Sequence, residues 1–96
     1  MTSSAEQNLA SLGITLPEAP SPAANYVPYV IVGDMVYVSG QVPFVNGGLQ
    51  VTGKVGDTVT IEQAAGEARI CAINLIAQLK AACGGDLSRV VQVVKL

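Results

Sequence analysis

The longest regular pattern of apolar and polar positions predicts a helix over Ile61–Cys83. Thr60 and Gln63 are spaced as a capping box at its start, and the pair Gly84-Gly85 is typical of a helix end. Apolar residues recur at helical spacing on one side, while Glu62, Gln63, Glu67, Asn74 and Gln78 mark the opposite side. The apolar stripe consists of Ile61, Ala65, Ala68, Ala72, Leu75, Ile76, Leu79 and Cys83. Ile70 and Ile73 interrupt the polar side, so we expect a further element to cover part of it.

Short runs of β-branched and aromatic residues predict two hairpins before this helix and one strand after it. The first hairpin pairs Tyr26–Val32 with Met35–Gln41 through the turn Gly33-Asp34. The second pairs Val42–Val45 with Leu49–Thr52 through the turn Asn46-Gly47-Gly48, in which Asn-Gly suits the positive φ angles of tight hairpins. The last strand is expected at Val90–Leu96. The order strand, helix, strand predicts a right-handed crossover that returns this strand to the same sheet.

The first hairpin is apolar on both faces, which is typical of strands that are buried on both sides. One helix covers only one face of a sheet, so the pattern predicts that the other face meets a second subunit. Ahead of the hairpins, Ser3 or Ser4 is expected to cap a short helix over Glu6–Leu12, and the proline-containing segment Leu16–Pro22 is expected to be an extended arm. We therefore divide the chain into an N-terminal helix and arm, residues 1–22, and a domain, residues 23–96.

Composition and charge narrow the possible functions. Half of the 96 residues are apolar and 12% are charged, which argues against disorder. The net charge is −2 and the five Lys and Arg residues are dispersed, so general nucleic-acid binding is not expected. The absence of histidine excludes Ser-His-Asp and Cys-His catalysis, and two cysteines are too few for a zinc site made of cysteines alone. The sequence therefore predicts neither a metal nor a cofactor.

The two cysteines and the lack of targeting signals indicate a reducing compartment. Cys71 and Cys83 lie on one predicted helix, and twelve residues at 1.5 Å each separate them by about 18 Å, too far for a disulfide. They are read as unreactive core or boundary positions, since no cation lies beside them in the sequence. No signal peptide or membrane-length apolar run is evident. We expect a cytoplasmic protein without a membrane partner.

A set of motifs in a fixed order resembles the Rid (YjgF/RidA-like) family of imine/enamine deaminases. The central motif is Gly33–Pro43, which reads Gly-Asp-Met-Val-Tyr-Val-Ser-Gly-Gln-Val-Pro. Asn25-Tyr26-Val27 precedes it, while Gly53–Gly56 and Gly85–Val91 follow it in the family's order. The resemblance covers about residues 20 to 96, and the N-terminal helix is similar to an extension found in a side branch. It implies an α/β (α+β) chorismate-mutase-like fold, with a sheet packed against helices on one face, and a homotrimer with ligand clefts between subunits.

The resemblance also implies roles for three residues. Tyr26 matches a cleft-lining tyrosine and is the candidate catalytic residue, because a phenol can donate a hydrogen bond to a bound imine. Ser39 and Gly40 match positions where the backbone binds a substrate carboxylate. The structural alternatives are a sheet-edge packing role for Tyr26 and a β-bulge at Ser39-Gly40. The remaining aromatic residues, Tyr29, Tyr37 and Phe44, are expected to pack. Glu62 and Glu67 are expected on a solvated helix face.

The activity implied by the resemblance is hydrolysis of small 2-imino or enamine acids to 2-oxo acids and ammonia. The alternatives are a non-catalytic binder or sensor of small molecules on the same scaffold and, third, an endoribonuclease. The family's second half, with a carboxylate-binding arginine and a water-orienting glutamate, finds no match in this chain, whose last predicted strand ends without a turn. We therefore expect the natural domain to continue beyond Leu96, and the 96 residues alone to be inactive.

Overall fold

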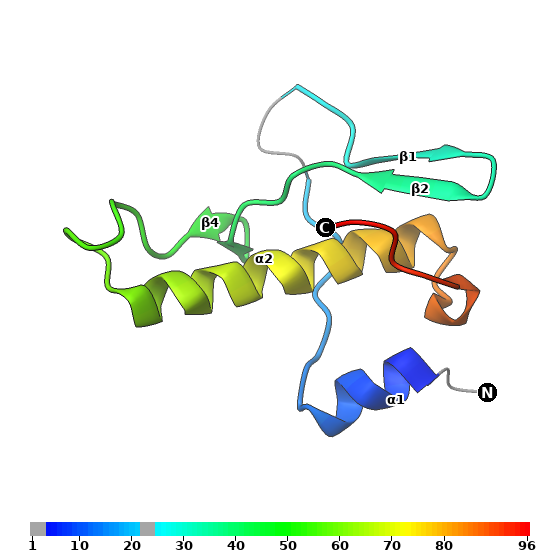
Figure 1. Cartoon of the computed structure of the whole chain (residues 1–96), viewed down its shortest axis with the longest axis horizontal. Helices are drawn as coiled ribbons and strands as arrows, with labels where there is room; N and C mark the ends of the chain where they lie inside the picture. The colour runs from blue at the N-terminus through cyan, green and yellow to red at the C-terminus, as the bar shows by residue number, and fades with distance from the viewer. Residues whose placement is uncertain (1–3, 22–24) are drawn as a thin grey trace.

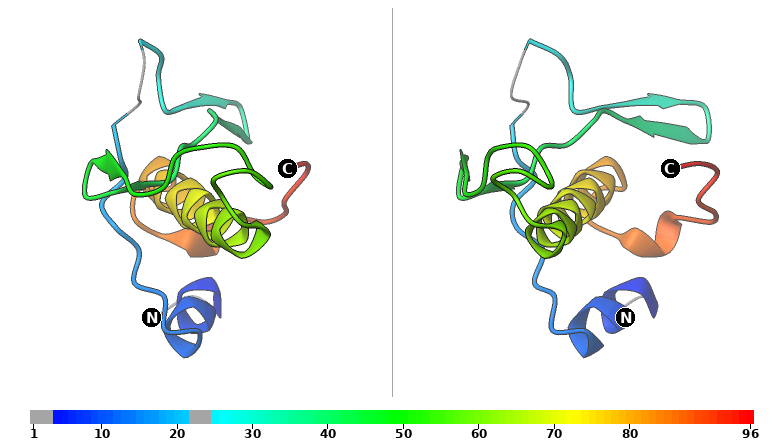
Figure 2. Two further views of the ribbon diagram at one scale, coloured as in Figure 1. Left: turned by 90° about the vertical axis from the view of Figure 1, so that its left-hand side faces the viewer. Right: turned by 60° about the vertical axis from the view of Figure 1, so that its left-hand side comes forward.

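The computed structural model describes residues 4–21 and 25–96, which form an α+β unit built around one long helix (Figure 1). The helix α2 lies between two small β-hairpins on one side and the N-terminal helix α1 on the other (Figure 2). In chain order the elements are α1 (Ser4–Ser11), β1 (Tyr29–Val32), β2 (Met35–Val38), β3 (Phe44–Val45), β4 (Gly48–Leu49), α2 (Ile61–Ala82) and the 3-10 turn η1 (Leu87–Arg89). This arrangement confirms the predicted fold class.

The first hairpin forms where the sequence predicts it, with shorter strands. Val32 pairs with Met35 across the Gly33-Asp34 turn, and Gly33 has a φ of +57°, as a two-residue hairpin turn with glycine first requires. The strands end at Tyr29 and Val38 rather than at the predicted residues 26 and 41. Proline at position 28 carries no N–H, so it cannot continue the ladder as a donor.

The second hairpin is a separate two-stranded sheet. Asn46 and Gly47 have φ values of +52° and +81°, the two consecutive positive angles of a type I′ turn. The turn consists of Asn46 and Gly47 and is one residue shorter than predicted, because Gly48 pairs with Val45 as the first residue of β4. Only Phe44–Val45 and Gly48–Leu49 pair around it. The predicted strands Val42–Val45 and Leu49–Thr52 are therefore mostly irregular backbone that lies along α2.

Helix α2 begins and ends as the sequence indicates. Gln63 N–H donates to Thr60 Oγ1 over 3.1 Å, and Thr60 N–H donates to Gln63 Oε1 over 2.8 Å, so the capping box is present. Cys83 is the C-terminal cap residue, and Gly84 follows it with a φ of +68°. Because glycine adopts this left-handed conformation without a side-chain clash, the helix stops at the predicted position.

The burial of α2 follows the predicted pattern only in part: Cys83, at the end of the apolar stripe, is buried, but so are residues of the predicted polar side. Asn74 and Gln78, expected on the polar and solvated side, are each only 2% exposed, whereas Ile61, at the start of the apolar stripe, is 74% exposed. Asn74 Nδ2 donates to the carbonyls of Val42 and Phe44 over 3.1 and 3.2 Å. The irregular backbone that follows β2 has carbonyls without a ladder partner, and buried amide side chains satisfy them. Glu67 is also half-buried rather than solvated.

The predicted last strand does not form. Residues 90–96 have no regular structure, and all of them except Val90 are exposed. A strand requires a neighbouring edge whose N–H and C=O groups complete its ladder, and within the described residues each hairpin pairs only with itself. The expected crossover into a single sheet is therefore absent from this structure.

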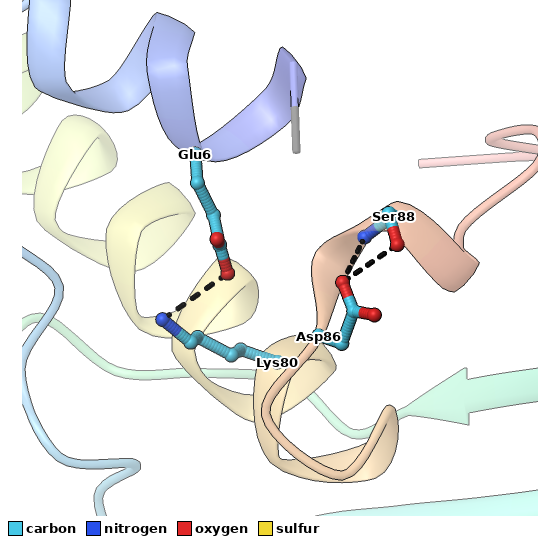
Figure 3. A network of polar contacts seen from close by, with 4 residues as sticks. All are labelled: Glu6, Lys80, Asp86 and Ser88. Atoms are coloured by element: carbon cyan, nitrogen blue, oxygen red, sulfur yellow. Dashed lines mark hydrogen bonds and ion pairs between the residues drawn. The ribbon is translucent and has the colours of Figure 1, made fainter. Parts of the chain in front are cut away.

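Helix α1 packs on the side of α2 that faces away from the hairpins. It spans Ser4–Ser11 rather than the predicted Glu6–Leu12, so Ser4 lies inside the helix, while the other candidate cap, Ser3, lies outside the described residues. Glu6 and Lys80 form an ion pair of 3.3 Å across the two helices (Figure 3). An open apolar cavity of about 210 Å³ lies between α1, α2 and η1 and is lined by residues of all three.

The turn after α2 has its own polar cap. The Asp86 carboxylate accepts hydrogen bonds from the Ser88 N–H and hydroxyl over 3.0 and 2.6 Å (Figure 3). These two bonds lower the pKa of Asp86 below its ordinary value, because they favour the ionised form. The exposed carboxylate thus orders the chain where it leaves the helix.

We predict that Asn74→Leu destabilises the fold by about 1–3 kcal/mol, because it removes the side-chain donor of the Phe44 carbonyl and one of the two donors of the Val42 carbonyl. Thermal and urea unfolding of the chain measure this difference. Arg69→Ala, an exposed substitution on the same helix, is the control and should change stability by less than about 0.5 kcal/mol. Equal stability of Asn74→Leu and the unsubstituted chain would show that these hydrogen bonds do not matter to the fold.

Candidate functional site

The three residues singled out from the sequence lie together at the end of the first hairpin. The Tyr26 hydroxyl donates a hydrogen bond to the Gly40 carbonyl over 3.2 Å. The Ser39 hydroxyl donates to the carbonyl of Val27 over 2.6 Å. The segment that enters β1 and the segment that leaves β2 are thus joined by side chains beyond the last ladder pair, Tyr29 and Val38.

Backbone hydrogen bonding extends this junction by one step. Ser39 N–H donates to the Pro28 carbonyl over 2.9 Å, so the two segments stay paired on one side of the proline. Past this point the chain no longer forms a ladder, and Gly40 is exposed. The site is therefore a hairpin end at which backbone groups become available to a ligand.

Gly40 has no evident steric reason to be glycine. Its φ is not in the left-handed region, and a Cβ placed on it would meet no atom within 4 Å among the described residues. Gly40 also lies outside the paired strands, so the bulge alternative finds no support in the ladder. Open space above a backbone is what the approach of a ligand requires.

Two amide side chains whose roles the sequence did not reveal contact this segment and the arm before it: Gln41, which is half-buried, and Gln78, which is buried. Gln41 Nε2 donates to the Ser39 carbonyl over 3.1 Å and to the Gly40 carbonyl over 3.4 Å. Gln78 Nε2 donates to the Pro20 carbonyl over 2.6 Å and approaches Gln41 Oε1 at 3.5 Å. The available signal for Gln78 was Ile70 and Ile73 on the same predicted polar side of the helix, because apolar residues there indicate that part of that side is covered.

The other candidate residues lie elsewhere. Tyr29 and Phe44 are half-buried, as expected of packing residues, but Tyr37 is 59% exposed, so its predicted packing role is wrong within this chain. Cys71 and Cys83 are both free thiols, half-buried and buried respectively. Burial raises the pKa of the Cys71 thiol, and the Glu67 carboxylate raises it further. A thiol kept protonated is a poor nucleophile, which agrees with the unreactive role expected for it.

The cations do not gather at the hairpin end. Lys80 pairs with Glu6 on the far side of α2, and the Arg89 guanidinium donates to the Cys83 carbonyl over 3.2 Å. Lys54, Arg69 and Lys95 are exposed on a loop, on α2 and near the C-terminal residue. Over residues 4–21 and 25–96, no group of three or more acidic, cysteine or histidine side chains could hold a metal ion. None of the helices in the same ranges is long and apolar enough to cross a membrane.

Comparison with known proteins places this geometry in context. Residues 6–96 match the family model described as "YjgF/chorismate mutase-like, putative endoribonuclease". The chain is 47% identical over 89 residues to Protein TCP17 of Trypanosoma cruzi, covering 93% of this chain and 55% of that protein. Among solved structures it is similar to the protein Atu1372 of Agrobacterium tumefaciens, a protein of unknown function, with 48% identity and a TM-score of 0.72 over 86% of this chain and 48% of that one.

A second solved structure matches more closely in shape. A putative endoribonuclease from Shewanella oneidensis MR-1 is 41% identical with a TM-score of 0.83, over 92% of this chain and 58% of that one. The chain thus spans about half the length of the relatives that it matches. The family model covers most of the chain, and the hairpin, the long helix and their order agree with it, so the chain belongs to the YjgF/chorismate mutase-like family.

Proposed function

We propose that this chain supplies the ligand-binding hairpin of an enzyme that hydrolyses small 2-imino and enamine acids to 2-oxo acids and ammonia. The observation that carries the proposal is the open space above Gly40, bordered by the Tyr26 hydroxyl and by Ser39. Within the described residues the Gly40 N–H donates to no other group, so it is available to a carboxylate oxygen. Backbone N–H groups bind anions well because their position is set by the fold.

Hydrolysis of an imine requires few catalytic groups, because the carbon of the C=N bond is already electrophilic. Water adds to the electrophilic carbon of the C=N bond, the nitrogen gains protons, and ammonia leaves as the C=O bond forms. Tyr26 is assigned as the hydrogen-bond donor to the reacting nitrogen or to the water, for which its single O–H turns from the Gly40 carbonyl to the substrate. The Gly40 N–H orients the substrate through its carboxylate, with Ser39 beside it. The proposal requires no metal or cofactor.

A carboxylate clamp is the part that this chain does not provide. Lys80 and Arg89 are engaged on the other side of α2, and the remaining cations lie on exposed surfaces away from the hairpin end. A substrate anion held by one N–H group alone is poorly oriented. Since the chain spans about half of the length of its matched relatives, we assign the arginine clamp and the water-orienting glutamate to the part of the relatives that it does not cover.

The hairpin end and the positions of the cations also bear on two other functions, small-molecule binding without catalysis and endoribonuclease activity. A non-catalytic small-molecule binder would use the same hairpin end and would differ only in producing no ammonia. An endoribonuclease, the activity in the name of the family and of the Shewanella protein, would require cations facing the RNA backbone. The dispersed cations and the net charge of −2 place this activity third.

The homotrimer is part of the same proposal. Val30, Val32, Met35 and Tyr37 share one face of the first hairpin, and each is at least 39% exposed. An apolar face of this kind is typical of a protein interface. A cleft at this interface would place the hairpin end beside a neighbouring subunit. The two free cysteines support a cytoplasmic, reducing setting.

The activity is tested with three proteins on the imine released from freshly made 2-aminoacrylate, by measuring pyruvate and ammonia. We expect this chain to be inactive, and a chain extended with the second half of the Shewanella protein to be active. Tyr26→Phe in the extended protein should lower kcat by about 100-fold, while Tyr37→Phe should not. Equal activity of the short and extended proteins would show that the active site is misplaced, and a folded but inactive extended protein would favour the binder.

Gly40→Val tests the ligand approach. We expect it to weaken binding of 2-oxobutanoate to the extended protein by at least about tenfold, because the side chain fills the space above the backbone, and to change the melting temperature little. Gly48→Val is a matched control, since a Cβ at Gly48 also meets nothing within 4 Å and its φ is not positive. Severe unfolding by Gly40→Val with unchanged binding in the residual folded protein would show that the glycine is structural.

The oligomeric state is tested by light scattering of the extended protein at micromolar concentration, where we expect a trimer. Val30→Glu should dissociate it, because a charge buried at an apolar interface is costly. Val55→Glu, at an exposed position in the loop before α2, should leave the trimer intact. A monomeric unsubstituted protein would contradict the proposed interface, and a dimer would contradict the expected symmetry.

A further inference from the structure

The buried side chain of Gln78 connects two segments that are far apart in the sequence. Its Nε2 donates to the carbonyl of Pro20 over 2.6 Å, across 58 positions, and the residue is 2% exposed. Pro20 belongs to the arm that passes beside α2 from α1 towards the first hairpin (Figures 1 and 2). The Pro20 carbonyl only accepts hydrogen bonds, so the nitrogen of Gln78, and not its oxygen, must face it.

The same nitrogen fixes the orientation of a second amide. Gln78 Nε2 lies 3.5 Å from Gln41 Oε1, which places the nitrogen of Gln41 on the opposite side. That nitrogen donates to the Ser39 and Gly40 carbonyls over 3.1 and 3.4 Å. A reversed Gln41 amide would set its oxygen against the two carbonyl oxygens of Ser39 and Gly40. The hydrogen bonds from Gln78 to Gln41, and from Gln41 to these carbonyls, therefore all require the same orientation of the Gln41 amide.

The last step of this series reaches the proposed ligand site. The Ser39 carbonyl and the Gly40 N–H belong to one planar trans peptide group, in which the two bonds point in opposite directions. A donor that holds the carbonyl on the buried side therefore directs the N–H away from it. The Gly40 carbonyl is held as well, by Gln41 and by the Tyr26 hydroxyl, so both peptide groups around Gly40 have defined orientations.

We infer that Gln78 and Gln41 are positioning residues that set the direction of the Gly40 N–H, and that the seating of the arm at Pro20 controls ligand affinity through them. The inference rests on the proposed function only for the identity of the ligand, a small 2-oxo or 2-imino carboxylate. The orientation of the peptide is a property of this chain and can be measured without substrate.

Three variants separate positioning from general stability. Gln78→Met keeps the length of the side chain and removes both amide donations, and Gln41→Met removes the next step at a half-buried position that should tolerate the change better. Asn74→Leu is the matched control: Asn74 is equally buried, one turn away on α2, and donates to the carbonyls of Val42 and Phe44 instead. It should reduce stability without turning the Ser39-Gly40 peptide.

The first measurement is the backbone NMR spectrum of the 96-residue chain. Gln78→Met and Gln41→Met should both shift the Gly40 amide and the Ser39 carbonyl resonances in the same direction, and the double variant should shift them no further than the larger single effect, because the two residues act in series. Asn74→Leu should leave both resonances in place. Unchanged Gly40 and Ser39 resonances in Gln78→Met and Gln41→Met, or equal shifts in Asn74→Leu, would overturn the inference.

The second measurement uses the extended protein with 2-oxobutanoate as the probe and the freshly made imine as substrate. Gln78→Met should weaken probe binding and raise KM by about tenfold, the effect of losing one well-placed hydrogen bond, with little change in kcat or its pH profile. An effect confined to kcat would contradict positioning of the carboxylate. If the unsubstituted protein makes no 2-oxo acid while the Gly40 resonances respond as expected, the deaminase proposal fails and the positioning role stands.

Discussion

The structure depends on a small number of buried amide side chains that satisfy backbone carbonyls. Asn74 and Gln78 lie one turn apart on α2, and together they donate to the carbonyls of Val42, Phe44 and Pro20. Pro20 and Val42 lie on irregular segments and Phe44 begins the short strand β3. A buried carbonyl without a donor costs free energy, and the two amides supply donors to these three. The amides thereby allow non-repetitive backbone to pack against a helix, as a site built from backbone groups requires.

The same constraint applies where the first hairpin ends, which is the place of the proposed ligand site. Up to Tyr29 and Val38 the backbone groups are used by the ladder, and Pro28 ends it by removing a donor. Beyond this point the hydroxyls of Tyr26 and Ser39 hold the two segments together with hydrogen bonds to backbone carbonyls. The Gly40 N–H thus forms no ladder hydrogen bond, but the contacts around it still fix its direction. A binding group of this kind combines availability with a fixed position.

The exposed apolar face of the first hairpin and the irregular conformation of residues 90–96 have the same physical cause. Both are segments of high β propensity whose natural partners, a strand edge or an apolar surface, are not present among the described residues. The chain spans about half of the length of the relatives that it matches. The proposed trimer and the proposed second half of the domain would each cover surface that this chain leaves exposed.

The sequence by itself determined the turns and the helix start, because interactions between a few neighbouring residues fix these features. Asn46-Gly47 and Gly33 specify their turns through positive φ angles, and Thr60 with Gln63 specifies the start of α2, because these effects need no distant partner. The motif around Ser39 and Gly40 likewise indicated the family and the candidate site. Only the tertiary structure decided which side of α2 is buried, since Asn74 and Gln78 look solvated until the carbonyls they bind are in place. The strand predicted at Val90–Leu96 failed for the same reason: a strand exists only where another edge completes its hydrogen bonds, and no local pattern contains that edge.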